Sequence, residues 1–166
     1  MSHILRNSKF KLHYSSSTGF TLLEMLLSVG IITIISVIGV SSFLNINRDR
    51  ALTAEVEKVL SLIAKARTFT ISEKDGGAYG VHFEQGKAVL FLGPTYNAGA
   101  GSNQAQTVNG AVRISAISLS GGGSEVLFRK LTGTAVQSGT ITIALVKDPS
   151  VTKVITIALT GVAYSN

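Results

Sequence analysis

The 166-residue chain contains no cysteine, so it can form neither a disulfide nor a thiolate metal site. This absence is compatible with any cellular compartment. Beyond residue 44 the only histidine is His82, which excludes a metal site built on two histidines. Acidic residues are few, nine against 15 Lys and Arg, and none precedes Glu24. The sequence therefore predicts no cofactor, no metal and no catalytic residues, and we do not expect an enzyme.

Proline is also absent until Pro94, so no proline interrupts a helix over residues 20–72. Within this stretch, the 25 residues from Phe20 to Leu44 include 16 large apolar residues and a single ionisable one, Glu24. At about 1.5 Å per residue, a helix of that length covers roughly 38 Å, enough to cross a bilayer core of about 30 Å. We predict a transmembrane helix over residues 20–44. An acid in such a helix is costly, so Glu24 requires a partner.

Residues 1–19 precede the apolar run with three basic residues, Arg6, Lys9 and Lys11, and no acid. A cationic segment in this position keeps the N-terminus cytoplasmic and places the rest of the chain outside. An ordinary cleaved secretory signal is the alternative, but its apolar region is usually about 7 to 15 residues long. The excess of basic over acidic residues is therefore partly a targeting signal, since the chain after residue 19 carries only 12 basic residues against nine acids.

The motif Gly19-Phe20-Thr21-Leu22-Leu23-Glu24, between a basic leader and a membrane run, resembles the prepilin processing signal. Type IV pilins and the pseudopilins of type II secretion share this signal. The resemblance implies that a prepilin peptidase cleaves between Gly19 and Phe20 and also N-methylates Phe20. It further implies other pilins or pseudopilins and an inner-membrane assembly platform as partners. The expected location is the bacterial inner membrane, with a single pass and a periplasmic globular domain, and then a filament.

Cleavage after Gly19 would leave a positive amine on Phe20, which can pair with Glu24 of a neighbouring parallel subunit. A charge pair of this kind would set the register between subunits, because removing one partner leaves the other buried alone. The alternative is local: Thr21-Leu22-Leu23-Glu24 also fits a helix capping box, in which Glu24 returns to its own backbone. The two roles are compatible.

Residues 45–75 should continue the same helix as an amphipathic half that packs on a domain, before Asp75-Gly76-Gly77 stops it. Its apolar residues follow helical spacing, and its charged residues Glu55, Lys58 and Lys65 mostly face elsewhere. The predicted packing face consists of Leu52, Val56, Val59, Leu60 and Ile63.

Two further segments are similar to the subgroup of minor pseudopilins formed by general secretion pathway protein H and the FimT-like proteins. They are Ala64-Lys65-Ala66-Arg67 followed by Ile71, and Val126-Leu127-Phe128 followed by Gly133. The leading interpretation is therefore a type II secretion pseudopilin of the H type. A minor type IV pilin used in motility or adhesion is an alternative.

After Gly77 the apolar period changes from 3.6 to 2, and residues 76–166 should form a β-rich pilin-like domain. Residues 78–83 and 87–92 read as a hairpin, and residues 93–110 as a long loop without a period. A bulge is expected where the parity changes after Ala116. The remaining predicted strands are residues 124–130, 140–146 and 151–159, the last with Leu159 on its apolar face. The fold class is α+β: a long N-terminal helix packed on six or seven strands in one or two antiparallel sheets.

Nucleic acid is the other partner that the composition allows, as in DNA-uptake pilins. The basic residues that could share a face are Arg113, Arg129, Lys130, Lys147 and Lys153. From Glu73 onward, however, seven basic residues against five acids leave a charge of only +2. The aromatics available for stacking are Tyr79, Tyr96 and Tyr164, while His82 is expected to be a half-buried structural residue. A membrane-tethered binding protein that never polymerises is a further alternative, but it leaves the leader and Glu24 unexplained.

Overall fold

The computed structural model describes residues 19–166, with the backbone alone for residues 38–48. The chain divides into two compact units, Met1–Ser41 and Ser42–Asn166. Helix α1, Leu22–Ile71, has residues in both units. The predicted leader, residues 1–19, lies outside the described residues except for Gly19.

Helix α1 ends at Ile71, four residues before the predicted stop at Asp75-Gly76-Gly77. Glu73 then adopts a left-handed conformation (φ 51°) and a short 3-10 helix, η1 (Lys74–Gly76), follows. The buried Thr70 hydroxyl donates to the Ala66 carbonyl and accepts from the Tyr79 N–H, at 2.9 and 2.8 Å. This side chain joins the last turn of α1 to the first strand, so the helix ends where the chain must reverse.

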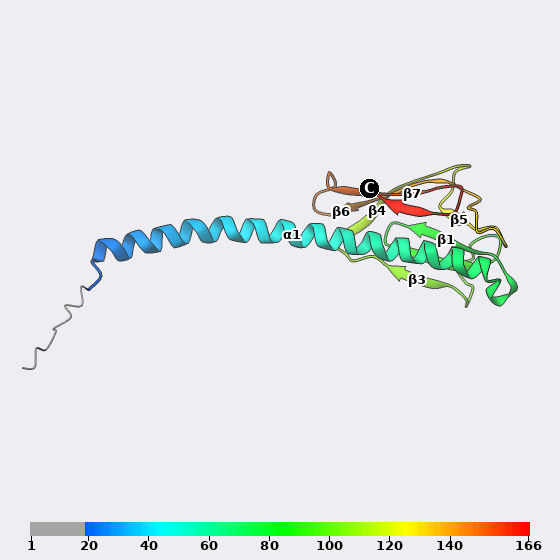
Figure 1. Cartoon of the computed structure of the whole chain (residues 1–166), viewed down its shortest axis with the longest axis horizontal. Helices are drawn as coiled ribbons and strands as arrows, with labels where there is room; N and C mark the ends of the chain where they lie inside the picture. The colour runs from blue at the N-terminus through cyan, green and yellow to red at the C-terminus, as the bar shows by residue number, and fades with distance from the viewer. Residues whose placement is uncertain (1–18) are drawn as a thin grey trace, which may run out of the picture. The chain divides into compact units, whose positions relative to one another are not determined.

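The globular unit contains eight strands in two antiparallel four-stranded sheets (Figure 1). The first sheet has the order β3-β2-β1-β5, and the second has the order β4-β6-β7-β8. The strands are β1 (Tyr79–Glu84), β2 (Lys87–Leu92), β3 (Gln104–Thr107), β4 (Val112–Leu119), β5 (Glu125–Leu127), β6 (Gly139–Leu145), β7 (Thr152–Ile157) and β8 (Ala163–Ser165).

The core of this unit lies between the second half of α1 and the two sheets (Figure 1). Four of the five predicted helix residues are fully buried in it: Leu52, Val56, Val59 and Ile63. Leu60 packs at the margin of the core. Each buried side chain of this size contributes about 1.5 to 3 kcal/mol, so the amphipathic half of α1 is a principal part of the core.

Glu55 does not face away from the domain as predicted, because it is buried to 3% exposure among these apolar residues. Its Oε1 pairs with Lys58 Nζ at 2.7 Å, while its buried Oε2 has no hydrogen-bond partner among the described residues. The amphipathic pattern placed the charged residues mostly on the outer face, but it cannot detect that Glu55 is buried beside Lys58, one turn along the helix.

The hairpin of β1 and β2 is confirmed, with Glu84 opposite Lys87 at its turn. The bulge in β4 is also confirmed, but at Ser115, one residue before the predicted change of parity. The strand predicted over residues 124–130 is shorter than expected: β5 ends at Leu127, and Phe128 adds a single bridge to Ala135.

The prediction of six or seven strands is wrong, because β3 and β8 were missed. Strand β3 lies within the supposed loop of residues 93–110 and pairs with β2, although three of its four residues are exposed and polar or small. Strand β8 follows a turn at residues 158–162, which leaves Leu159 61% exposed instead of on the apolar face of β7. Both strands are short and lack an apolar period.

The remaining part of the long loop covers the sheet face that points away from α1. Alternate residues of β2 face opposite sides, so Ala88 and Leu90 join the core while Val89 and Phe91 are buried on the other side. Tyr96 of the loop stacks on His82 with ring centroids 4.0 Å apart and meets Phe91 edge-on at 5.7 Å. The loop therefore forms a second, smaller apolar layer.

Candidate functional site

The start of α1 is the first candidate site. The Glu24 N–H donates to Thr21 Oγ1 at 3.2 Å, and the Met25 N–H donates to the Thr21 carbonyl at 3.1 Å. Thr21 is therefore the N-cap of the helix, which is one half of the expected capping box. The reciprocal bond is missing: within the described part of the chain, no hydrogen bond or ion pair reaches the Glu24 carboxylate. A shallow hollow of about 320 Å³ beside it is lined by Gly19, Phe20, Thr21 and Glu24.

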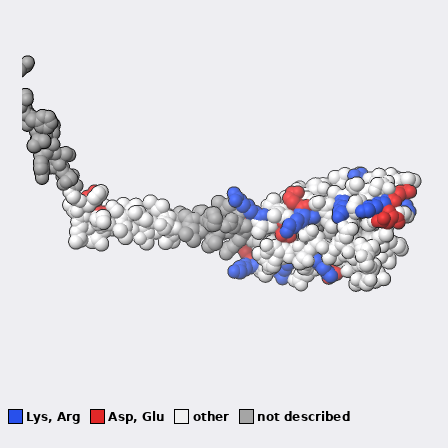
Figure 2. Space-filling view, turned by 90° about the horizontal axis from the view of Figure 1, so that it is seen from below, with Lys and Arg blue, Asp and Glu red and all other residues white. Residues whose placement is uncertain are grey.

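The surface that follows Glu24 is apolar on every side of the helix. Phe20 is 76% exposed, and every large apolar residue from Leu22 to Val37 is exposed as well. Figure 2 shows this stretch almost entirely white, whereas side chains of both charges lie on the described part of the unit Ser42–Asn166. An exposed apolar surface of this kind marks a site that another apolar phase or protein covers.

The side-chain hydroxyls on this surface form their hydrogen bonds within the helix itself. The hydroxyls of Ser28, Thr33 and Ser36 each donate at 2.7 Å to the carbonyl four residues earlier. Groups that are paired in this way need no water, as in helices that lie in lipid or in a helical bundle. Glu24 is then the one ionisable side chain from Gly19 to Val37.

Within the described residues, no helix is both long and apolar enough to span a membrane. The predicted span of residues 20–44 includes residues 38–44, whose side chains lie outside the described ones.

The five basic residues suggested for nucleic acid are not brought together on one face. Arg113 lies opposite Ala144 in the second sheet, and Lys153 lies opposite Ile143. Since residues 143 and 144 point to opposite faces, Arg113 and Lys153 do so too. The other three lie in turns: Arg129 and Lys130 after β5, and Lys147 after β6.

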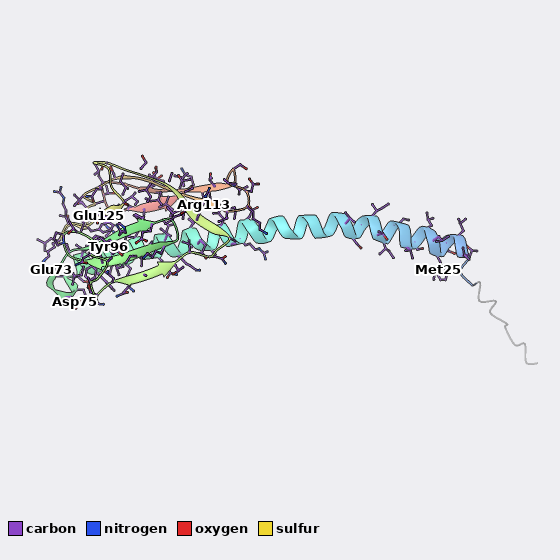
Figure 3. All side chains as sticks on the ribbon, turned by 180° about the vertical axis from the view of Figure 1, so that it is seen from behind. Met25, Glu73, Asp75, Tyr96, Arg113 and Glu125 are labelled. Carbon is purple, nitrogen blue, oxygen red and sulfur yellow. The ribbon has the colours of Figure 1, made fainter. Side chains whose placement is uncertain are left out.

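The aromatic residues suggested for base stacking are also mostly occupied. Tyr79 is buried to 4% exposure, which corrects the prediction that it is available, and Tyr96 is stacked on His82. Tyr164 is 48% exposed. Figure 3 shows Tyr96 near Glu125, with Arg113 toward the other end of the unit.

His82 is half-buried, as predicted, and lies between two carboxylates. Its Nε2 is 3.9 Å from Glu84 Oε1, and its Nδ1 is 3.9 Å from Glu125 Oε2. Glu125 Oε2 also accepts the Tyr96 N–H at 3.1 Å, which holds the loop over the sheet. Nevertheless, no group of three or more metal-ligating side chains occurs among the residues whose placement is described.

Arg67, Gly133 and Gly161 meet in a cluster that we call the Arg67 junction. Arg67 Nε donates to the Gly133 carbonyl at 3.0 Å, joining residues 66 positions apart. Both glycines have positive φ, and a Cβ on Gly161 would lie 1.9 Å from the Gly133 oxygen and 3.0 Å from Arg67 Nε. A Cβ on Gly133 would strike Ile71. The sequence singled out Arg67, Ile71 and Gly133 but gave no signal of their contact or of Gly161.

A search of protein-family models and of curated protein sequences finds no match to this chain. The fold is similar to the crystal structure of the type IV minor pilin FimU from Pseudomonas aeruginosa strain PAO1, with a TM-score of 0.53. The similarity covers 69% of this chain and 92% of that chain, at 16% sequence identity. At this identity the likeness shows the fold alone. The chain therefore has an α+β, pilin-like fold, as predicted.

Proposed function

We propose that this chain is a structural subunit of a type IV pilus-like or type II secretion filament, and specifically a minor pseudopilin of the H and FimT-like subgroup. The observation that carries the proposal is the Glu24 carboxylate, which has no partner among the described residues and lies at the start of an exposed apolar helix. The pilin-like fold of the rest of the chain supports it.

In this proposal, prepilin peptidase cleaves between Gly19 and Phe20 and methylates the new amine. Thr21 caps the helix without using the Glu24 carboxylate, so the carboxylate stays available for another chain. The Phe20 amine of one subunit then pairs with Glu24 of a neighbour as their helices pack side by side. Because the surroundings are apolar, either charge without the other is strongly unfavourable, which fixes the register of the subunits.

Before assembly, residues 20–44 hold the subunit in the bacterial inner membrane with the globular unit on the periplasmic side. The basic leader supports this orientation. An inner-membrane assembly platform would then transfer the helix from lipid into a bundle of similar helices. The apolar surface of α1 and its internally bonded hydroxyls suit both environments.

Mass spectrometry of the N-terminal peptide, from membranes of cells with and without prepilin peptidase, tests the proposal. We expect a methylated Phe20 start in the first case and an intact leader in the second. An intact Met1 in both strains would contradict processing. A start near Ser42 would instead indicate ordinary signal cleavage, and with it a secreted protein.

A further inference from the structure

Arg67 carries a positive charge that has no acidic partner in the part of the chain that the structure describes. Its side chain is half-buried on α1, and Nε is occupied by the Gly133 carbonyl. Among the described residues no carboxylate forms an ion pair with its guanidinium, although Glu55 pairs with Lys58 and Glu84 with Lys87 elsewhere. The bond through Nε fixes the plane of the guanidinium and leaves its terminal nitrogens as donors. The donors of an arginine guanidinium bind a carboxylate well, because two parallel hydrogen bonds can form.

Arg67 lines a small pocket of about 170 Å³. The pocket is lined by the α1 residues Leu60, Ile63, Ala64, Arg67 and Thr68 and by Gly161, Val162 and Ala163. Apart from Arg67 and the Thr68 hydroxyl, the side chains that line it are apolar. The pocket is the right size for one side chain and too small for a large ligand.

Exposed aliphatic side chains occur on the same segments that form the Arg67 junction. They are Ile71, Leu131, Leu159 and Val162, with Leu131 78% exposed. The Ala135 N–H donates to the Leu159 carbonyl at 3.0 Å, which holds the two turns side by side. Arg129 and Lys130 belong to the first of these turns and add positive charge.

We propose that the Arg67 junction and its aliphatic rim form a docking surface for a partner protein that presents a carboxylate side chain beside an apolar one. A fixed arginine within an apolar surface is the composition of a binding hot spot between proteins. The rim is aliphatic, whereas single-stranded nucleic acid is bound by exposed aromatic residues that stack on bases. This surface includes neither Phe20 nor Glu24, so the inference goes beyond the proposed filament contact.

A titration of the ¹⁵N-labelled full chain in detergent micelles tests this inference, with the capped tripeptide Leu-Glu-Leu as the probe. We expect the Arg67 Nε–H resonance and the amides of Gly161 and Val162 to shift with increasing peptide. The matched peptide Leu-Gln-Leu should bind at least tenfold more weakly, because it lacks the charge. Equal shifts with both peptides, or none with either at millimolar concentration, would overturn the proposal.

Val162→Asp separates binding from folding. Val162 is exposed, so the change should leave the fold intact while placing a carboxylate beside Arg67 that competes with the peptide. The control is Val146→Asp, an equally exposed site away from the junction, which should bind as the unmodified chain does. A short single-stranded DNA oligomer is titrated as the last probe. Shifts at Arg67 with DNA but not with the acidic peptide would replace a protein partner by a nucleic acid.

Discussion

Glu24 illustrates how one residue can have two compatible functions. Its N–H completes the Thr21 cap, while its carboxylate remains without a partner in the part of the chain that the structure describes. Helix formation therefore uses the backbone of Glu24, and the proposed assembly contact uses its side chain. These two functions can be separated by a substitution that changes the side chain alone.

We predict that Glu24→Gln leaves the protein in the membrane but reduces its incorporation into filaments by about tenfold or more. The reason is that the Phe20 amine of a neighbour would then be buried without a counter-charge. Sheared filaments and membranes are compared by quantitative immunoblotting. Glu57→Gln, at an exposed position of the same helix, is the control. If Glu24→Gln and the unmodified chain are incorporated equally, the charge pair does not set the register.

Tyr79 gives the fold a measurable dependence on alkaline pH. Burial, then the 2.5 Å hydrogen bond to Asp75 Oδ2 and the charge of Asp75, raise the pKa of Tyr79 from 10.0 to about 12. The unfolded chain therefore loses this proton first as pH rises, so the folded chain binds more protons between these values. The free energy of unfolding must fall with pH across that window, and Tyr79 adds no pH dependence well below it.

The expected result is a decline in the free energy of unfolding between about pH 10 and 12 that is less steep in Tyr79→Phe. Urea unfolding of both proteins at pH 9, 10, 11 and 12, followed by circular dichroism, measures it. Lysines titrate in the same range in both proteins, so the difference between them isolates Tyr79. Parallel declines would show that Tyr79 ionises normally in the folded chain.

At the scale of elements, the segment between β2 and β3 has a structural function. Tyr96 anchors it by stacking on His82, by its edge-on contact with Phe91 and by its N–H bond to Glu125. We predict that Tyr96→Ala lowers the free energy of unfolding by about 1 to 3 kcal/mol, because aromatic contacts and burial are lost together. Chemical denaturation measures the change, with Tyr164→Ala as the control at an exposed site. Equal effects of the two substitutions would mean that the loop is not anchored through Tyr96.

The sequence predicted those elements whose signal is local. Helix α1 and the β1–β2 hairpin follow from apolar periods that neighbouring residues supply. Strand β3 does not, since the polar sequence Gln-Ala-Gln-Thr becomes a strand only through its pairing with β2. Glu55 was assigned to the outer face because the pattern does not register its pairing with Lys58.

The candidate sites differ in the same way. The helix start was predictable because its motif and its apolar run are continuous in the sequence. The Arg67 junction was not, because Arg67, Gly133 and Gly161 are separated by long stretches of chain and only the fold brings them together. The basic residues illustrate the converse, since residues of similar charge lie on opposite faces once the register is known.

At the scale of the whole molecule, the division into two compact units predicts how truncated chains behave in water. A chain that begins at Ser42 retains the buried residues of α1 and should be monomeric and cooperatively folded without detergent. A chain that begins at Lys74 loses Leu52, Val56, Val59 and Ile63, which together contribute about 6 to 12 kcal/mol, comparable to the entire stability of a domain. Size-exclusion chromatography and thermal unfolding distinguish the two. Cooperative folding of the shorter chain would show that the globular unit does not need the buried residues of α1 for its core.

The arrangement of the strands bears on how this protein resists aggregation. Each sheet has two edge strands, and an open edge is a template for amyloid-like growth. Three of the four edges are strands of only three or four residues, β3, β5 and β8. The fourth, β4, is longer, but its bulge at Ser115 interrupts the regular row of donors and acceptors. The sheets can therefore be held at high local concentration without joining one another edge to edge.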